Sequence, residues 1–346
     1  MRWTNLLVLI PLISLLGCTA SRQDVHSPEN SKTVDVGGYR LRLLVRGNGT
    51  PTVVLESGLG AGVESWTRVR ASVAKFARVV SYDHAGIGGS EPRPKPRTGQ
   101  QIATELNTAL KTAELGPPYV LVGHSIGGPY IHVFASLYPS EVAGMVFVDP
   151  TQYRLSQENA DVTGWLRGHH PEKARDLEDK FGRAQLSEGI QDLLRVQFSD
   201  VVKQGEEILA SAPERLRHQW ASIMHKEQLE MMREESLQSL ATMPQPVREE
   251  FEGMLSTIHQ AQAASLRPNL PVVVLANSKR DSTLTPAEQA LEGVRIERRL
   301  ESYREWLRKL PSGKLMVTDK SGHDIPNDEP DLVVNAIRLV IASAKQ

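Results

Sequence analysis

Short apolar runs alternate with amphipathic segments along most of this chain. Runs rich in β-branched residues predict strands at 39–45, 52–56, 78–82, 119–122, 143–148, 270–276 and 314–317. Apolar residues at helical spacing predict helices at 64–76, 98–115, 129–137 and 289–310, and a last helix opening at Pro330. This alternation predicts an α/β fold, in which a mostly parallel sheet is covered by helices on both faces.

The strand pattern disappears between residues 151 and 268. Apolar residues there recur at helical spacing on otherwise charged segments, as at Leu216, Trp220 and Ile223, which predicts several amphipathic helices. Methionine, which suits an adaptable apolar wall, gathers in this region. We expect most of these residues to serve internal packing: Met224, Met231, Met232, Met243 and Met254.

The first 33 residues are expected to lie outside the folded core. Residues 1–17 predict a signal peptide, because Arg2 precedes a nearly continuous apolar stretch at 6–16. That stretch is short for the ~20 residues of a membrane-spanning helix. Residues 18–33 are polar and predict a flexible tether.

Cys18 is the only cysteine of the chain, and it follows Leu15, Leu16 and Gly17. This tetrapeptide resembles the lipobox of bacterial lipoproteins, although Leu16 replaces the small residue usual there. The resemblance implies that Cys18 carries a lipid and that the exported protein is held at a membrane of the cell envelope. Simple secretion after cleavage near residues 18–20 is the alternative.

Composition narrows the remaining possibilities. The chain has 346 residues, of which 40% are hydrophobic and 23% charged, as is ordinary for a globular protein. A formal net charge of -1 and the lack of a long basic run give no indication of nucleic-acid binding. His169 and His170 have no further metal ligands at the spacing typical of zinc sites, so we expect no metal.

The segment YVLVGHSIGGPY at 119–130 predicts a strand, a tight turn and a helix. It contains the pattern G-x-S-x-G from Gly123 to Gly127, whose glycines allow a strained turn that lifts the serine hydroxyl clear of the sheet. Ser125 is therefore a candidate nucleophile. The backbone N–H of Ile126, at the start of the helix, is a candidate donor to an oxyanion.

Further motifs fall at the ends of other predicted strands. They are ESGLG at 56–60, YDHAGIGGS at 82–90, FVDP at 147–150 and SGHDIP at 321–326. Together with GHSIGG at 123–128, they resemble the landmarks of the α/β-hydrolase superfamily, in particular the capped serine hydrolases that include esterases. The resemblance implies a hydrolase core at 34–150 and 269–346 and a helical cap at 151–268, inserted after the strand that ends at Asp149.

The resemblance also implies site residues. His323 follows the last strand, where the superfamily places its catalytic base, and Leu59 offers a second backbone N–H to the oxyanion. For the acid we favour Asp281, because the order Ser125, Asp281, His323 is the common one and Asp281 follows a strand in a polar loop. Asp149 and Asp324 are the alternatives.

These residues predict hydrolysis of a carboxylic ester through an acyl-enzyme, without a cofactor. Serine at the turn argues against the haloalkane dehalogenases and epoxide hydrolases of related proteins, which use aspartate there. Acyl transfer and other chemistry of the same triad stay open, as does an envelope protein that binds a ligand without turnover. The expected partners are a small acyl substrate and, through Cys18, a membrane.

Overall fold

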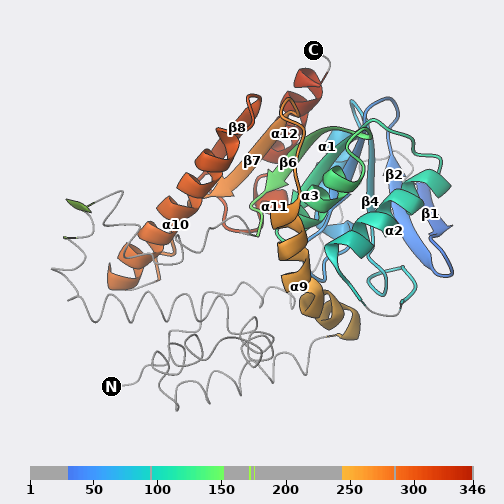
Figure 1. Ribbon diagram of the computed structural model, residues 1–346, viewed down its shortest axis with the longest axis horizontal. Helices are drawn as coiled ribbons and strands as arrows, with labels where there is room; N and C mark the ends of the chain where they lie inside the picture. The colour runs from blue at the N-terminus through green and yellow to red at the C-terminus, as the bar shows by residue number, and fades with distance from the viewer. Residues whose placement is uncertain are drawn as a thin grey trace. The chain divides into compact units, whose positions relative to one another are not determined.

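The computed structural model of the chain describes residues 30–93, 96–151, 171–172, 175, 244–283 and 286–344 (Figure 1). Its centre is an eight-stranded sheet with the order β1-β2-β4-β3-β5-β6-β7-β8. The strands are β1 (Asn30–Asp35), β2 (Arg40–Arg46), β3 (Thr52–Glu56), β4 (Arg78–Tyr82), β5 (Tyr119–His124), β6 (Val142–Val148), β7 (Val272–Asn277) and β8 (Gly313–Thr318).

The sheet is parallel from β4 to β8, whereas β1 and β2 pair antiparallel at one edge. The central strands β3 and β5 to β7 are almost wholly buried and apolar, as expected for a sheet covered on two sides. Successive residues point to opposite faces: Val122 lies in one apolar cluster of the core and Leu121 in the other. The predicted α/β architecture is confirmed.

Helices cover both faces. On one face lie α1 (Thr67–Val73), which follows the 3-10 turn η2 (Val63–Trp66), and α11 (Ile325–Asp328) and α12 (Pro330–Ser343). On the other face lie α2 (Gly99–Thr112), α3 (Gly127–Leu137) and α10 (Pro286–Leu307). Parallel strands joined by helices end at the same edge of the sheet, so the loops after β3, β5, β6 and β8 are brought together there.

Residues 30–33 differ from the expected tether, because they belong to β1. Here polar residues form an edge strand whose partner β2 follows directly through a tight turn. The Asp35 carboxylate accepts hydrogen bonds from the N–H groups of Gly37 and Gly38, and Val36 N–H donates to Tyr39. Of this strand only Val34 is buried, which explains why hydrophobic patterning missed it.

Helix α9 (Gln245–Ala263) lies in the range expected to be cap, yet it belongs to the same compact unit as the sheet. It packs against α2 and α3, as Figure 1 shows. Buried contacts fasten it: the Thr257 hydroxyl accepts from Gly99 N–H at 2.9 Å. The rest of the expected cap, the signal peptide, Cys18 and residues 18–29 fall almost wholly outside the described residues. Within the described part, no helix combines the length and apolar character needed to cross a membrane.

Candidate active site

The turn after β5 holds Ser125 in a strained conformation. Its φ is 55°, a left-handed value that a non-glycine residue rarely adopts outside functional turns. The glycines on either side are required because a larger residue would clash with the backbone. A Cβ at Gly123 would lie 2.4 Å from the carbonyl oxygen of Gly127, and a Cβ at Gly127 would lie 2.7 Å from the carbonyl oxygen of Glu56. The structure therefore has the strand, sharp turn and helix that the sequence predicted.

The loops after β6 and β8 bring Asp149 and His323 together. Asp149 Oδ2 lies 2.7 Å from His323 Nδ1. Because an ionised carboxylate only accepts hydrogen bonds, Nδ1 carries the hydrogen and Nε2 is left as the basic nitrogen. Asp149 is 3% exposed and His323 is 36% exposed, so a buried acid supports a base that solvent and ligands can reach.

Asp149 is held rigidly by β7 and α10. Its Oδ1 accepts the backbone N–H of Asn277 at 3.1 Å, and its Oδ2 accepts the Asn277 side chain at 2.6 Å. Arg299 Nη1 lies 3.6 Å from Oδ1. Burial raises the pKa of Asp149, but the His323 hydrogen bond and the Arg299 charge outweigh it, and the pKa lies below its ordinary value. Asp149 is thus a fixed carboxylate.

The prediction that Asp281 pairs with His323 is wrong. The Asp281 carboxylate turns back onto its own loop, where Oδ1 accepts from the N–H and the hydroxyl of Thr283 at 2.8 and 2.6 Å. These two hydrogen bonds lower its pKa. Asp149, which the sequence left as an alternative, takes the place because it directly follows β6, the strand next to β5, and its φ of 39° turns the chain at the sheet edge.

The two expected oxyanion donors lie next to the turn. Ile126 immediately precedes α3, and the first amides of a helix have no acceptor within it. Leu59 lies in the loop after β3, which touches the turn: a Cβ at Gly58 would be 3.3 Å from that of Ser125. Ile126 and Leu59 also share a small apolar cluster with Ile102, Tyr130 and Met254.

His124 is a site residue that sequence reasoning missed. Its Nε2 lies 2.9 Å from the carbonyl oxygen of His323, and the two imidazole rings are 4.7 Å apart. Burial and the neighbouring His323 lower the pKa of His124 to about 4, so the ring is neutral at pH 7 and donates from Nε2. The only sequence signal was its place inside G-x-S-x-G, at a position where any residue fits the pattern.

Among the described residues, no group of three or more His, Cys, Asp or Glu side chains is arranged to hold a metal ion. The arrangement around Ser125 can support attack by a hydroxyl group: a base with a defined tautomer, a fixed acid and two backbone donors meet at one edge of the sheet.

Comparison with known proteins agrees with this architecture. A family model for the alpha/beta hydrolase fold matches residues 51–206. The uncharacterized protein YqjL of Bacillus subtilis is 30% identical over 152 residues, which cover 44% of this chain and only 58% of YqjL. An AB hydrolase superfamily protein of Gibberella zeae is 25% identical over 312 residues, 84% of this chain and 86% of the relative.

Among solved structures, a thermophilic esterase from Thermogutta terrifontis superposes with a TM-score of 0.53 at 19% identity, covering 92% of this chain and 100% of the esterase. At this identity the likeness concerns the fold. Together with the sheet order and the turn at Ser125, these matches show that the chain has the α/β-hydrolase fold.

Proposed function

We propose that the protein is a serine hydrolase that cleaves carboxylic esters through an acyl-enzyme. One observation carries the proposal: the strained turn presents Ser125 at the sheet edge where Asp149 binds Nδ1 of His323, which leaves Nε2 as the basic nitrogen. The esterase among the structural relatives has this fold and adds support at that level.

In the proposed reaction, His323 Nε2 takes the proton of the Ser125 hydroxyl as the serine oxygen attacks the ester carbonyl. Asp149 stabilises the imidazolium that forms and keeps the ring in its orientation. The imidazolium then gives its proton to the leaving alcohol. Water, activated by the same nitrogen, attacks the acyl-enzyme and restores Ser125.

The negative oxygen of each tetrahedral intermediate is assigned to the N–H groups of Leu59 and Ile126. The N-terminus of α3 favours negative charge at Ile126. Removing one such donor typically raises the barrier by ~3 kcal/mol, so the position of the loop at 56–60 matters for rate.

The test is hydrolysis of a series of p-nitrophenyl esters by the wild-type protein and by Ser125→Ala. We expect turnover by the wild type and its loss in the variant, with circular dichroism showing that both are folded. Equal turnover in both proteins would refute Ser125 as the nucleophile. A wild-type protein that binds the esters without cleaving them would favour the alternative of a non-catalytic binding protein.

Acyl transfer to another acceptor is the second candidate, because it uses the same acyl-enzyme. Adding a competing alcohol separates the two: a hydrolase releases mainly free acid, whereas a transferase forms the new ester. Residues 151–268 are proposed to set the acyl preference. Trp220→Ala and Met231→Ala should then change kcat/KM for short and long esters unequally, and an equal change would assign both residues to packing.

The proposed location is the cell envelope, with a lipid on Cys18. A single acyl chain binds a membrane only marginally, but several chains on one terminus anchor a protein stably. Cys18→Ala should therefore move the protein out of the detergent phase or block its processing. An unmodified N-terminus beyond Cys18, seen by mass spectrometry, would refute the anchor.

A further inference from the structure

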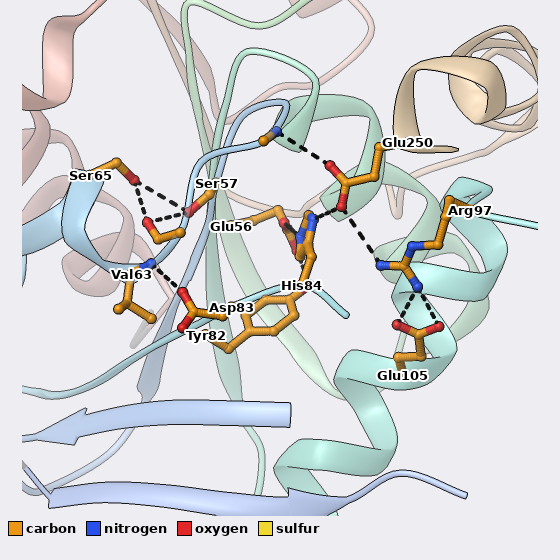
Figure 2. A network of polar contacts seen from close by, with 12 residues as sticks. Glu56, Ser57, Val63, Ser65, Tyr82, Asp83, His84, Arg97, Glu105 and Glu250 are labelled. Atoms are coloured by element: carbon orange, nitrogen blue, oxygen red, sulfur yellow. Dashed lines mark hydrogen bonds and ion pairs between the residues drawn. The ribbon is translucent and has the colours of Figure 1, made fainter. Parts of the chain in front are cut away.

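A cluster of buried ionisable side chains lies beside the loop that carries Leu59 (Figure 2). Its members come from β3, β4, the loops that follow β4, α2 and α9, and each is at most 2% exposed: Glu56, Tyr82, His84, Arg97, Glu105 and Glu250. Removing a charge from water costs several kcal/mol, and only close pairing offsets that cost. The ion pairs and hydrogen bonds among these side chains therefore fix the positions of the strands, loops and helices that carry them.

His84 lies between two carboxylates. Its Nε2 is 2.5 Å from Glu56 Oε1, and its Nδ1 is 2.6 Å from Glu250 Oε1. Ionised carboxylates only accept hydrogen bonds. Both ring nitrogens of His84 must therefore carry a hydrogen to bind the two carboxylates. A neutral imidazole has only one N–H, whereas an imidazolium has two. Burial lowers the pKa of His84, but Glu250 and Glu56 outweigh it and raise the pKa to about 10.

This imidazolium reaches both ends of the loop at 56–60, which we call the oxyanion loop. Glu56 is the last residue of β3 and opens the loop. At its other end, the N–H of Gly60 faces Glu250 Oε2 at 3.5 Å. The contacts from Glu56 through His84 and Glu250 to Gly60 thus form a ring around Leu59.

Helix α9 is fitted tightly to the same loop. Gly60 has a φ of 66°, and a Cβ there would lie 2.8 Å from Val247 Cγ1. Glu250, one turn further along α9, carries the charge contact to His84. The loop is therefore held by an ionic contact and by a steric contact from one helix.

We propose that His84 is a positioning residue whose imidazolium clamps the two ends of the oxyanion loop and fastens α9 to it, so that the Leu59 N–H is fixed for catalysis. The clamp stands on the geometry alone, and its catalytic consequence rests on the proposed function. Arg97 completes it, because its Nη1 binds both Glu105 oxygens at 2.7 and 2.8 Å and its Nη2 lies 3.7 Å from Glu250 Oε1.

The clamp should weaken in alkaline solution. The groups around His84 are Glu56 on β3, Tyr82 on β4, Glu250 on α9, Tyr130 on α3, and Arg97 before the start of α2, which binds Glu105 within that helix. A histidine whose folded pKa is raised stabilises the fold below its unfolded pKa, ~6.5, and loses that contribution as pH rises. The contribution of His84 should therefore fall between pH 7 and its pKa of about 10.

Hydrogen exchange tests the clamp independently of any activity. In His84→Gln, amides at 57–61 and 245–250 should exchange at least about tenfold faster than in the wild type, because both segments lose their common partner. His132→Gln is the matched control, since His132 is equally buried but packs against Phe147 and Trp306 instead. If His84→Gln does not fold, Glu250→Gln, which keeps the side-chain shape, should give the same pattern.

Kinetics tests the catalytic consequence. Activity is expressed as kcat per serine labelled by a fluorophosphonate, so that misfolded protein is not counted. A misplaced oxyanion donor should lower kcat of His84→Gln by about ten- to a hundredfold with little change in KM, since the donor acts in the transition state. Raising pH from 7 to 10 should lower the protection of the amides at 57–61, measured relative to their intrinsic base-catalysed exchange rates, in the wild type and not in His84→Gln.

Unchanged exchange in both segments, or equal acceleration in His132→Gln, would overturn the clamp. Faster exchange with an unchanged kcat would overturn its catalytic consequence. A wild-type protein that the fluorophosphonate does not label would refute the proposed function, whereas the exchange result would still decide the clamp.

Discussion

The Nε2 atom of His124 donates a hydrogen bond to the backbone carbonyl of His323 at 2.9 Å, which ties the residue before the nucleophile to the base. We expect His124→Phe, which keeps a ring but has no donor, to lower kcat/KM about fivefold, because a lost hydrogen bond costs ~1 kcal/mol and frees the base loop. Ester kinetics measure this. An unchanged kcat/KM would mean that ring packing alone positions the loop.

His124 should also make stability depend on pH. Its folded pKa is lowered to about 4, so between about 4 and the unfolded value of ~6.5 the unfolded chain binds the extra proton. Stability should therefore fall as pH is lowered through this window, and His124→Phe should remove part of that slope. Urea unfolding at several pH values measures the effect. Identical slopes in both proteins would contradict it.

Replacing the acid gives the clearest comparison between sequence and structure. Asp149→Asn should lower kcat by up to ~10⁴-fold, because the amide no longer fixes the tautomer of His323 or stabilises the imidazolium. Asp281→Asn is the matched control, and it should change kcat only slightly, since the hydrogen bonds of Asp281 within the described part of the chain are with Thr283 and Glu292. A mild effect at Asp149 beside a severe one at Asp281 would restore the assignment made from sequence.

Arg299 should influence the pH dependence of catalysis through its contact with Asp149. Its guanidinium lies 3.6 Å from Asp149 Oδ1 and partly offsets the carboxylate charge. In Arg299→Met the uncompensated carboxylate should favour imidazolium formation, so the acid limb of the kcat/KM profile should move to higher pH. Arg299→Lys keeps the charge and should move it less. Superimposable profiles for all three proteins would show that Arg299 only packs.

The strain at Ser125 should be measurable in proteins that cannot react. Ser125→Gly and Ser125→Ala both lack the hydroxyl, but only glycine adopts a φ of 55° without steric cost. We expect the glycine variant to be more stable by up to about 1 kcal/mol, the left-handed penalty of alanine less the extra entropy of unfolded glycine. Thermal unfolding of the two variants decides this, and a less stable glycine variant would contradict the strain.

Much of the fold and part of the site could be predicted because their signals are local. The central strands are continuous apolar runs, and the turn at Ser125 needs glycines at fixed spacing. The acid could not be chosen, because Asp149 and Asp281 both follow strands. Only the tertiary structure shows that Asn277 of β7 orients Asp149 toward His323.

The clamp at His84 was beyond sequence reasoning for a related cause. Its partner Glu250 is 166 residues away and lies in a segment that reads as an ordinary charged amphipathic helix. Periodicity predicts that such a helix has a buried face, but it does not predict a buried carboxylate on that face. The edge strand β1 was not predicted, because a single buried residue does not produce the alternation of apolar and polar positions that indicates a strand.

The central claim is that Ser125 is an activated nucleophile, and covalent labelling tests it most directly. The wild-type protein is treated with a fluorophosphonate, digested, and mapped by tandem mass spectrometry. We predict one stoichiometric adduct on Ser125 in the wild type. Labelling should be lost in Ser125→Ala, and it should be much slower in His323→Ala than in the wild type. No adduct on the folded protein, or an adduct at another residue that persists in Ser125→Ala, would contradict the account.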